Sequence, residues 1–115
     1  MVNISSVHAH GGGSEHFAYG TSKCGLNFIT KHSAGELLES GIRLNAINVG
    51  WCLTPSEDAL QKATAGDDWL ETAQRSFPTG KLLSPVDVAV TAGYAPCPTA
   101  APGQLSPRLF PSLAP

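Results

Sequence analysis

The most constraining feature of the sequence is a succession of strand, long helix and strand in its first half. The apolar run Val2–Ser6 predicts a strand, and the loop HAHGGGSEH after it is too rich in glycine to hold regular structure. Apolar residues at helical spacing follow from about Phe17 to Ser40, with Gly41 as a left-handed C-cap candidate. Residues 42–47, IRLNAI, predict a second strand. Such a crossover normally joins parallel strands and places the helix on one face of the sheet.

Two further helices are predicted from N-terminal capping patterns. TPSE at 54–57 offers an N-cap threonine, a proline at the first helical position and a glutamate at the capping-box position. SPVD at 84–87 repeats this pattern before a short apolar helix that extends to about Ala92. From Ala95 onward the chain holds six of its nine prolines and no acidic residue. Helix and central strand are both excluded there, so a disordered or extended tail is expected.

Composition narrows the function classes. The chain has 115 residues, 42% of them hydrophobic, which is the size of one domain or part of one. Its formal net charge is −2 and only 14% of residues are charged, so nucleic-acid binding is not expected. No apolar stretch approaches the roughly 20 residues of a membrane helix, and no basic, apolar leader is visible. The three cysteines, Cys24, Cys52 and Cys97, are odd in number and far apart, which favours a reduced, cytoplasmic setting.

The motif YGTSK places Tyr19 and Lys23 four residues apart at the start of the predicted helix. Residues at this spacing lie on one helix face, so the phenol and the ammonium can point into one cleft. A nearby cation favours the phenolate form of tyrosine, which makes Tyr19 a candidate general acid or base. Ser6, at the mouth of the first strand, can reach the same point and hydrogen-bond a substrate oxygen. The alternative is surface decoration, but chance would produce all three residues at this spacing in roughly one sequence in a hundred.

Ser6, Tyr19 and Lys23 match the signature of the short-chain dehydrogenase/reductase family, in which a serine is followed thirteen residues later by a tyrosine and four further by a lysine. The chain also resembles this family through VNISS, the helix after YGTSK, and IRLNAINVG, over about 2–94. The resemblance implies an α/β fold: residues 1–94 are expected to be the C-terminal half of an NAD(P)-binding domain. This is a partial Rossmann-like fragment, or doubly wound parallel sheet, followed by a proline-rich irregular tail at 95–115.

By this resemblance the protein is an NAD(P)-dependent oxidoreductase that interconverts an alcohol and a carbonyl by hydride transfer, with a small-molecule substrate. Tyr19 would be the catalytic acid/base, Lys23 would favour its phenolate and hold the nicotinamide ribose, and Ser6 would orient the substrate oxygen. Gly50 would allow close backbone approach to the nicotinamide, although Val49 stands where the family usually has proline. Thr54 would contact the carboxamide or the phosphates, and a plain helix N-cap is an equally good interpretation of it.

The segment after Thr54 falls where the family has its mobile substrate lid. Trp51, Leu60 and Trp69 are therefore candidates for shaping the substrate pocket, or Trp69 packs only against its own helix. The polar character of this region favours a small polyol, sugar or hydroxy compound as substrate.

The glycine-rich turn that binds the cofactor pyrophosphate is not in this sequence, so NAD and NADP remain equal possibilities. The resemblance places Val2 near the middle of a chain roughly twice this length, and the proline-rich tail stands where the family continues with a helix and a strand. A truncated chain, inactive and poorly folded alone, is therefore expected. The alternative is a non-catalytic remnant that pairs its long helix with a partner. In a full-length parent, the helix 17–40 is expected to build a homo-oligomer.

The histidines of the loop have a spacing at which imidazoles can share a zinc or copper ion. His8, His10 and His16 are close in sequence, but no fourth ligand is evident, and we expect no metal. The run GGGS at 11–14 lacks the lysine that follows in a P-loop, so it does not predict a phosphate cradle.

Overall fold

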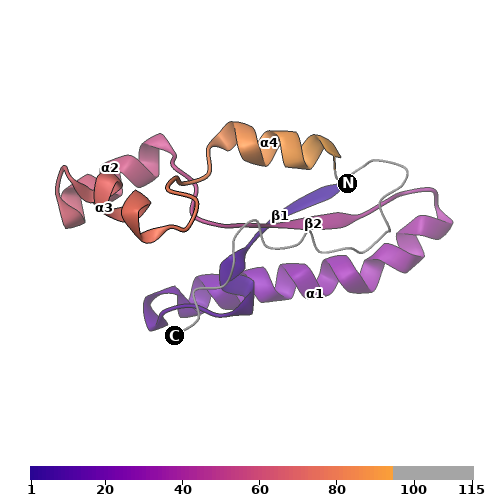
Figure 1. The fold of residues 1–115 in the computed structure, drawn as a ribbon. Helices are drawn as coiled ribbons and strands as arrows, with labels where there is room; N and C mark the ends of the chain where they lie inside the picture. The colour runs from indigo at the N-terminus through magenta and orange to yellow at the C-terminus, as the bar shows by residue number, and fades with distance from the viewer. Residues whose placement is uncertain (95–115) are drawn as a thin grey trace. The chain divides into compact units, whose positions relative to one another are not determined.

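A computed structural model describes residues 1–94, and the predicted tail at 95–115 lies outside the described residues (Figure 1). The described residues divide into two compact units, one formed by residues 1–50 with residues 90–94, and the other by residues 51–89. No helix among residues 1–94 is long and apolar enough to cross a membrane.

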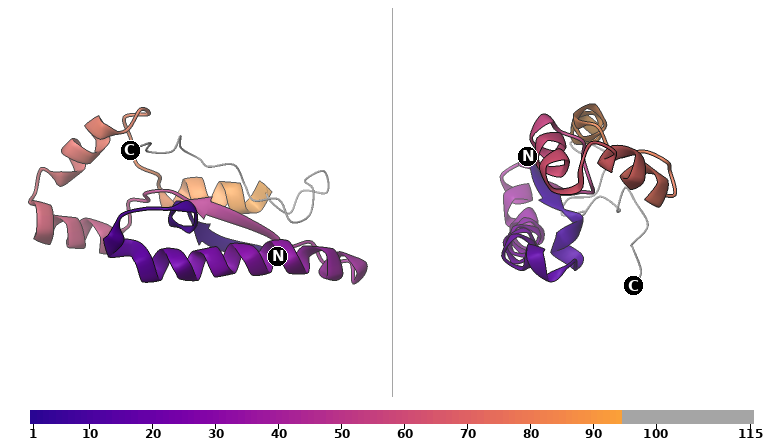
Figure 2. Two further views of the ribbon diagram at one scale, coloured as in Figure 1. Left: turned by 90° about the horizontal axis from the view of Figure 1, so that it is seen from below. Right: turned by 90° about the vertical axis from the view of Figure 1, so that its left-hand side faces the viewer.

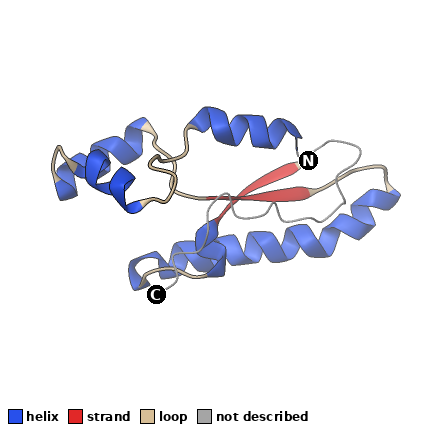
Figure 3. Ribbon diagram, in the orientation of Figure 1, coloured by secondary structure: helices blue, strands red, loops and turns tan. Residues whose placement is uncertain are grey.

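The first unit is a strand–helix–strand crossover. Strand β1 (Val2–Ser6) pairs in parallel with β2 (Asn45–Val49), with Val2 opposite Asn45 and Ser6 opposite Val49 (Figure 3). Helix α1 (Phe17–Glu39) connects them and runs along one face of the two strands (Figure 1, Figure 2). The parallel crossover predicted from the sequence is confirmed.

The core of the first unit is centred on β2. Ile47 is fully buried, and Leu44, Ala46 and Ala34 are nearly so. Four successive residues of β2 are buried although their side chains alternate between the two faces of the sheet. Burial on both faces is typical of a strand in a parallel sheet.

The junction between α1 and β2 corrects one prediction. The second strand begins at Asn45 rather than at Ile42. Gly41 adopts φ +73°, its N–H donates to the carbonyl of Leu38, and the N–H of Ile42 donates to the carbonyl of Leu37. This pair of bonds is a Schellman motif, which needs a left-handed residue such as glycine. Because the backbone of Ile42 closes the helix, the strand starts only after it.

The loop after β1 corrects a second prediction, since it holds two short 3₁₀ turns, η1 (Val7–His10) and η2 (Ser14–His16). The first turn is capped by Ser6, whose hydroxyl oxygen accepts a hydrogen bond from the backbone N–H of His8 at 3.2 Å. A serine cap of this kind can start a turn in a segment whose glycines alone argue against one.

The second unit contains α2 (Pro55–Ala65), α3 (Trp69–Ser76) and the first half of α4 (Pro85–Tyr94). Trp69, Ala73 and Leu82 form its core, and the rings of Trp51 and Phe77 pack around it. The ends of the segment are held together by two backbone hydrogen bonds: Leu53 N–H to the Leu83 carbonyl at 2.8 Å, and Leu83 N–H to the Trp51 carbonyl at 3.0 Å. This unit therefore has its own core, and backbone hydrogen bonds join the two ends of its segment.

Both predicted helix starts of this unit are observed. Thr54 Oγ1 accepts a hydrogen bond from the Glu57 N–H at 3.2 Å, and Ser84 and Asp87 form a reciprocal capping box. Glu57 departs from the pattern in one respect: its carboxylate accepts the indole N–H of Trp51 at 2.7 Å.

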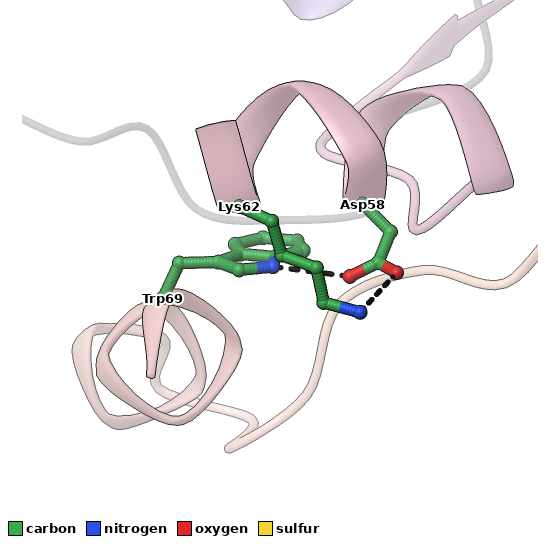
Figure 4. Close-up of polar contacts among 3 residues, drawn as sticks. All are labelled: Asp58, Lys62 and Trp69. Atoms are coloured by element: carbon green, nitrogen blue, oxygen red, sulfur yellow. Dashed lines mark hydrogen bonds and ion pairs between the residues drawn. The ribbon is translucent and has the colours of Figure 1, made fainter. Parts of the chain in front are cut away.

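One carboxylate joins α2 to α3 (Figure 4). Asp58 Oδ1 accepts the indole N–H of Trp69 at 3.1 Å, and Oδ2 accepts from Lys62 Nζ at 2.8 Å. The hydrogen bond from Lys62 and, after it, the one from Trp69 lower the pKa of Asp58. A carboxylate with a lowered pKa in the folded state stabilises that state at neutral pH.

The free energy of unfolding of the second unit should therefore decrease at low pH, because Asp58 becomes protonated. Its contribution is complete above the ordinary aspartate pKa and is lost as the pH falls through the lowered folded-state value. We expect Asp58→Asn to destabilise the unit at neutral pH and to weaken the acid dependence, measured by tryptophan fluorescence during unfolding from about pH 7 down to about pH 2.

Asp68→Asn is the matched control, because the side chain of Asp68 makes no cap hydrogen bond at the start of α3. The same loss of acid dependence in both variants would contradict a specific role for Asp58. Some dependence is expected to remain in Asp58→Asn, because hydrogen bonds from Ser84 also lower the pKa of Asp87.

Candidate active site

Tyr19 and Lys23 meet on one face of α1, as the spacing predicts. The Nζ atom of Lys23 lies 5.6 Å from the centre of the Tyr19 ring. Tyr19 is 47% exposed, so its ring is open to a ligand. An ammonium this close to a phenol ring is attracted to the ring face.

Lys23 is fixed to β1 at two points. Its Nζ donates to the carbonyl of Ile4 at 2.9 Å, and its own carbonyl accepts from the hydroxyl of Ser5 at 3.3 Å. The ammonium is therefore positioned by strand backbone rather than left on a freely rotating chain. An ammonium has three donors, and the bond to Ile4 is the one that Nζ makes within residues 1–94, which leaves two for a ligand.

Ser6 ends β1 and is 4% exposed. Its oxygen accepts from the N–H of His8, which leaves the hydroxyl hydrogen available as a donor. The same residue, His8, places its ring 6.0 Å from the Tyr19 ring in an edge-to-face arrangement. Tyr19 and Lys23 thus lie together directly, and Ser6 is linked to them through His8.

The contact of His8 with Tyr19 was missed by the sequence interpretation, which weighed His8 only as a metal ligand. Among residues 1–94, no three histidine, cysteine, aspartate or glutamate side chains are placed to hold a metal ion. Instead, the rings of His8 and His16 stack with centroids 4.3 Å apart. Their relation depends on the two 3₁₀ turns, which the glycine-rich sequence did not predict.

A second missed feature is a buried amide pair. Asn27 Nδ2 of α1 donates to Asn48 Oδ1 of β2 at 2.9 Å, and both residues are more than nine-tenths buried. Asn27 is four residues after Lys23 and therefore lies on the same side of the helix. That spacing was the one signal in the sequence that could have identified it.

The two predicted cofactor residues beyond α1 lie in different units. Gly50 directly follows β2, at the strand end where Ser6 faces Val49. Ligands of open parallel sheets bind at the carboxyl ends of the strands, so this position suits a cofactor contact. Thr54 belongs to the second unit and caps α2, as the alternative interpretation has it. A cofactor contact of Thr54 stays a prediction.

The predicted lid residues differ in exposure. Trp69 is 4% exposed and belongs to the core of its own unit, whereas Leu60 is 56% exposed. Trp51 is half-buried and bonded to Glu57. Of the three, Leu60 offers the most free apolar surface.

Comparison with known proteins decides the family. A family model described as enoyl-(acyl carrier protein) reductase matches residues 1–98, most of the chain. Short-chain reductase protein NovJ of Streptomyces niveus is 31% identical over 100 residues, which are 85% of this chain and 38% of NovJ. The chain belongs to the short-chain dehydrogenase/reductase family.

Other members of the family show the same extent of similarity. The 3-oxoacyl-[acyl-carrier-protein] reductase FabG of Thermotoga maritima is 35% identical over 89 residues, covering 77% of this chain and 34% of FabG. A solved structure of actinorhodin polyketide ketoreductase with NADPH superposes with a TM-score of 0.82 at 26% identity, covering 95% of this chain and 44% of the ketoreductase. This short-chain dehydrogenase/reductase thus spans less than half the length of these relatives.

The buried amide pair yields a prediction about stability. Asn27→Ala leaves Asn48 Oδ1 buried without its donor, and we expect the free energy of unfolding to fall by about 1–3 kcal/mol. Denaturant unfolding measures this loss. Replacing Asn48 by Ala as well should cost less than the sum of the two single variants, because the second change removes the unsatisfied group. Additive losses would show that the amide bond does not couple α1 to β2.

Proposed function

We propose that this chain forms the catalytic part of an NAD(P)-dependent oxidoreductase that interconverts a small alcohol and its carbonyl compound. The observation that carries the proposal is the placement of Lys23 Nζ 5.6 Å from the ring of a half-exposed Tyr19, beside the end of β1. Membership of a family of oxidoreductases supports it, as does the ketoreductase relative solved with NADPH.

In carbonyl reduction, Tyr19 donates its phenolic proton to the carbonyl oxygen as that oxygen gains charge. The hydroxyl of Ser6 donates a hydrogen bond to the same oxygen and orients it. Lys23 supplies a positive charge that stabilises the phenolate left behind. The nicotinamide cofactor, when bound, supplies the hydride. In alcohol oxidation the proton returns to the phenolate of Tyr19.

The cofactor would be held at the carboxyl ends of the strands. Lys23 keeps two ammonium donors beyond its bond to Ile4, which suits hydrogen bonds to the ribose hydroxyls. Gly50 presents backbone without a side chain at the end of β2, and Thr54 would meet the carboxamide or phosphates. These donors do not distinguish NAD from NADP.

We infer a small carbonyl or hydroxy compound as substrate. The relatives named as a 3-oxoacyl reductase and a polyketide ketoreductase make a 3-oxo ester such as ethyl acetoacetate a rational first probe. The free thiols of Cys24 and Cys52 suit a reducing, cytoplasmic setting.

Tyr19→Phe tests the proposal, because it removes the phenolic proton and keeps the ring. In the protein that carries this chain, we expect turnover of ethyl acetoacetate with NADPH or NADH to fall by at least about 100-fold, the contribution of a general acid. Cofactor affinity, measured by fluorescence titration, should change little.

Tyr94→Phe is the matched control, since Tyr94 is 72% exposed at the end of α4. It should be indistinguishable from the unaltered protein. Near-normal turnover in Tyr19→Phe would contradict the assignment of the acid/base.

A second candidate function, association through α1, is favoured by exposed apolar side chains on that helix. Phe28 is 69% exposed and Ile29 is 58% exposed, and the ring of Phe28 stacks on His32. Exposed apolar residues grouped in this way mark association surfaces. We propose that this part of α1 joins two copies of the protein, with pairing to another helix as the non-catalytic alternative.

Phe28→Glu should therefore weaken self-association, because it places a charge in the middle of the proposed surface. Sedimentation velocity is expected to show a shift from oligomer to monomer. Leu60→Glu, at an apolar and exposed position on α2, serves as the control and should leave the oligomer intact. A monomer before any substitution would contradict the proposal.

A further inference from the structure

His8 contacts Ser6 and Tyr19, the two residues that the proposed reaction uses in addition to Lys23. Its backbone N–H donates to the Ser6 hydroxyl oxygen at 3.2 Å. Its imidazole ring meets the Tyr19 ring edge-to-face at a centroid distance of 6.0 Å and an interplanar angle of 70°. Because His8 N–H occupies the oxygen of Ser6, the hydroxyl hydrogen of Ser6 remains the donor. The ring of His8 also lies against the Tyr19 ring.

The ring of His8 is itself held in place by its surroundings. His16 stacks on it at 4.3 Å with an angle of 19° between the rings. A Cβ at Gly12 would lie 2.4 Å from His8 Nδ1, and one at Gly20 would lie 2.8 Å from the His8 carbonyl oxygen. Glycine at both positions allows this close approach. His8 is therefore packed against the ring of His16 and against the backbone at Gly12 and Gly20.

Burying the imidazole of His8 costs free energy that an apolar ring of the same size would not cost. Within residues 1–94, Nδ1 of His8 is buried and makes no hydrogen bond. A buried polar atom without a partner costs free energy that a phenyl ring of similar size would not. In this part of the chain, the ring of His8 is therefore held by packing and not by a hydrogen bond at Nδ1.

We propose that His8 is a positioning residue of the oxidoreductase reaction, which orients the Tyr19 ring through its imidazole and the Ser6 hydroxyl through its backbone. This inference rests on the proposed function. His8 also lines a pocket of about 280 Å³ together with His16, Phe17 and the glycine run, whereas Tyr19 does not line it. It thus borders that pocket and also contacts the phenol ring.

The charge state of His8 gives the proposal a distinct readout. Burial and then the neighbouring His16 lower the pKa of His8, whereas Glu15 opposes them. Among residues 1–94, the other titratable groups near it are Tyr19 against its ring, Cys24 of α1 in the same pocket and His10 in its own turn, with Lys23 on the Tyr19 ring. Protonation of His8 would place a positive charge against the Tyr19 ring. The NMR signals of that ring should therefore shift when His8 is protonated, at a pH below the ordinary histidine pKa of 6.5.

The test compares His8→Ala and His8→Phe with His10→Ala, an exposed histidine of the same turn. Tyr94→Phe is introduced throughout, so that Tyr19 is the sole tyrosine of this sequence. NMR follows the Tyr19 ring protons against pH, and kinetics follow ethyl acetoacetate reduction in the protein that carries this chain.

We expect the Tyr19 resonances to shift with a midpoint below 6.5 in the parent and in His10→Ala, and to lose that step in both His8 variants. His8→Ala should lower kcat by about 10- to 100-fold with KM nearly unchanged, since a misplaced catalytic group costs rate rather than binding. His8→Phe keeps a ring against Tyr19 and should recover most of kcat at neutral pH.

An unchanged Tyr19 titration together with a kcat for His8→Ala equal to that of His10→Ala would overturn the proposal. An equal loss of kcat in His8→Ala and His8→Phe would do the same, because ring contact would then not be what positions the phenol. Failure of the proposed function has a different signature, full activity of Tyr19→Phe. The NMR step reports on His8 in either case.

Discussion

The attachment of Lys23 to β1 is the interaction on which the rest of the candidate site depends. Its ammonium donates to the carbonyl of Ile4 and its carbonyl accepts from Ser5, so one residue fixes both the height and the rotation of α1 against the strand. A slide of one residue would rotate the helix by about 100°. Tyr19, one turn earlier, would then leave the strand end. Lys23 therefore supplies the positive charge of the candidate site and also positions α1 against β1.

Buried polar contacts extend this registration along α1. Asn27 bonds to Asn48 of β2, and Asn3 of β1 donates to Thr30 at 2.8 Å. Hydrogen bonds of this kind contribute modest net stability, but a shifted register would leave each group unsatisfied. At the other end, His8 holds Ser6 and Tyr19 in relation to each other. The helix is thus placed by directional contacts in addition to apolar packing.

Local patterns predicted both strands, α1 and the starts of α2 and α4, because strand periodicity, capping residues and Gly41 act within a few residues, whereas α3 and the two 3₁₀ turns were not predicted. β1 and the start of α1 at Phe17 were predicted at their observed positions. The start of β2 was predicted three residues early, since Ile42 closes a Schellman motif instead of joining the sheet. The hydrogen bond of Asn27 to Asn48 joins residues that are distant in sequence. The contact of His8 with Tyr19 depends on the capped turn after β1. Such contacts follow from tertiary structure, which spacing alone does not give.

The central claim is that Tyr19 and Lys23 serve direct hydride transfer between a nicotinamide cofactor and a carbonyl carbon. Deuterium transfer in the protein that carries this chain tests it most directly, with NADPH or NADH labelled at C4 of the nicotinamide in either stereochemical form and ethyl acetoacetate as acceptor. We predict that one labelled form, and not the other, places deuterium on the new carbinol carbon of the product. A product without deuterium from either form, or no consumption of either nucleotide, would contradict the account.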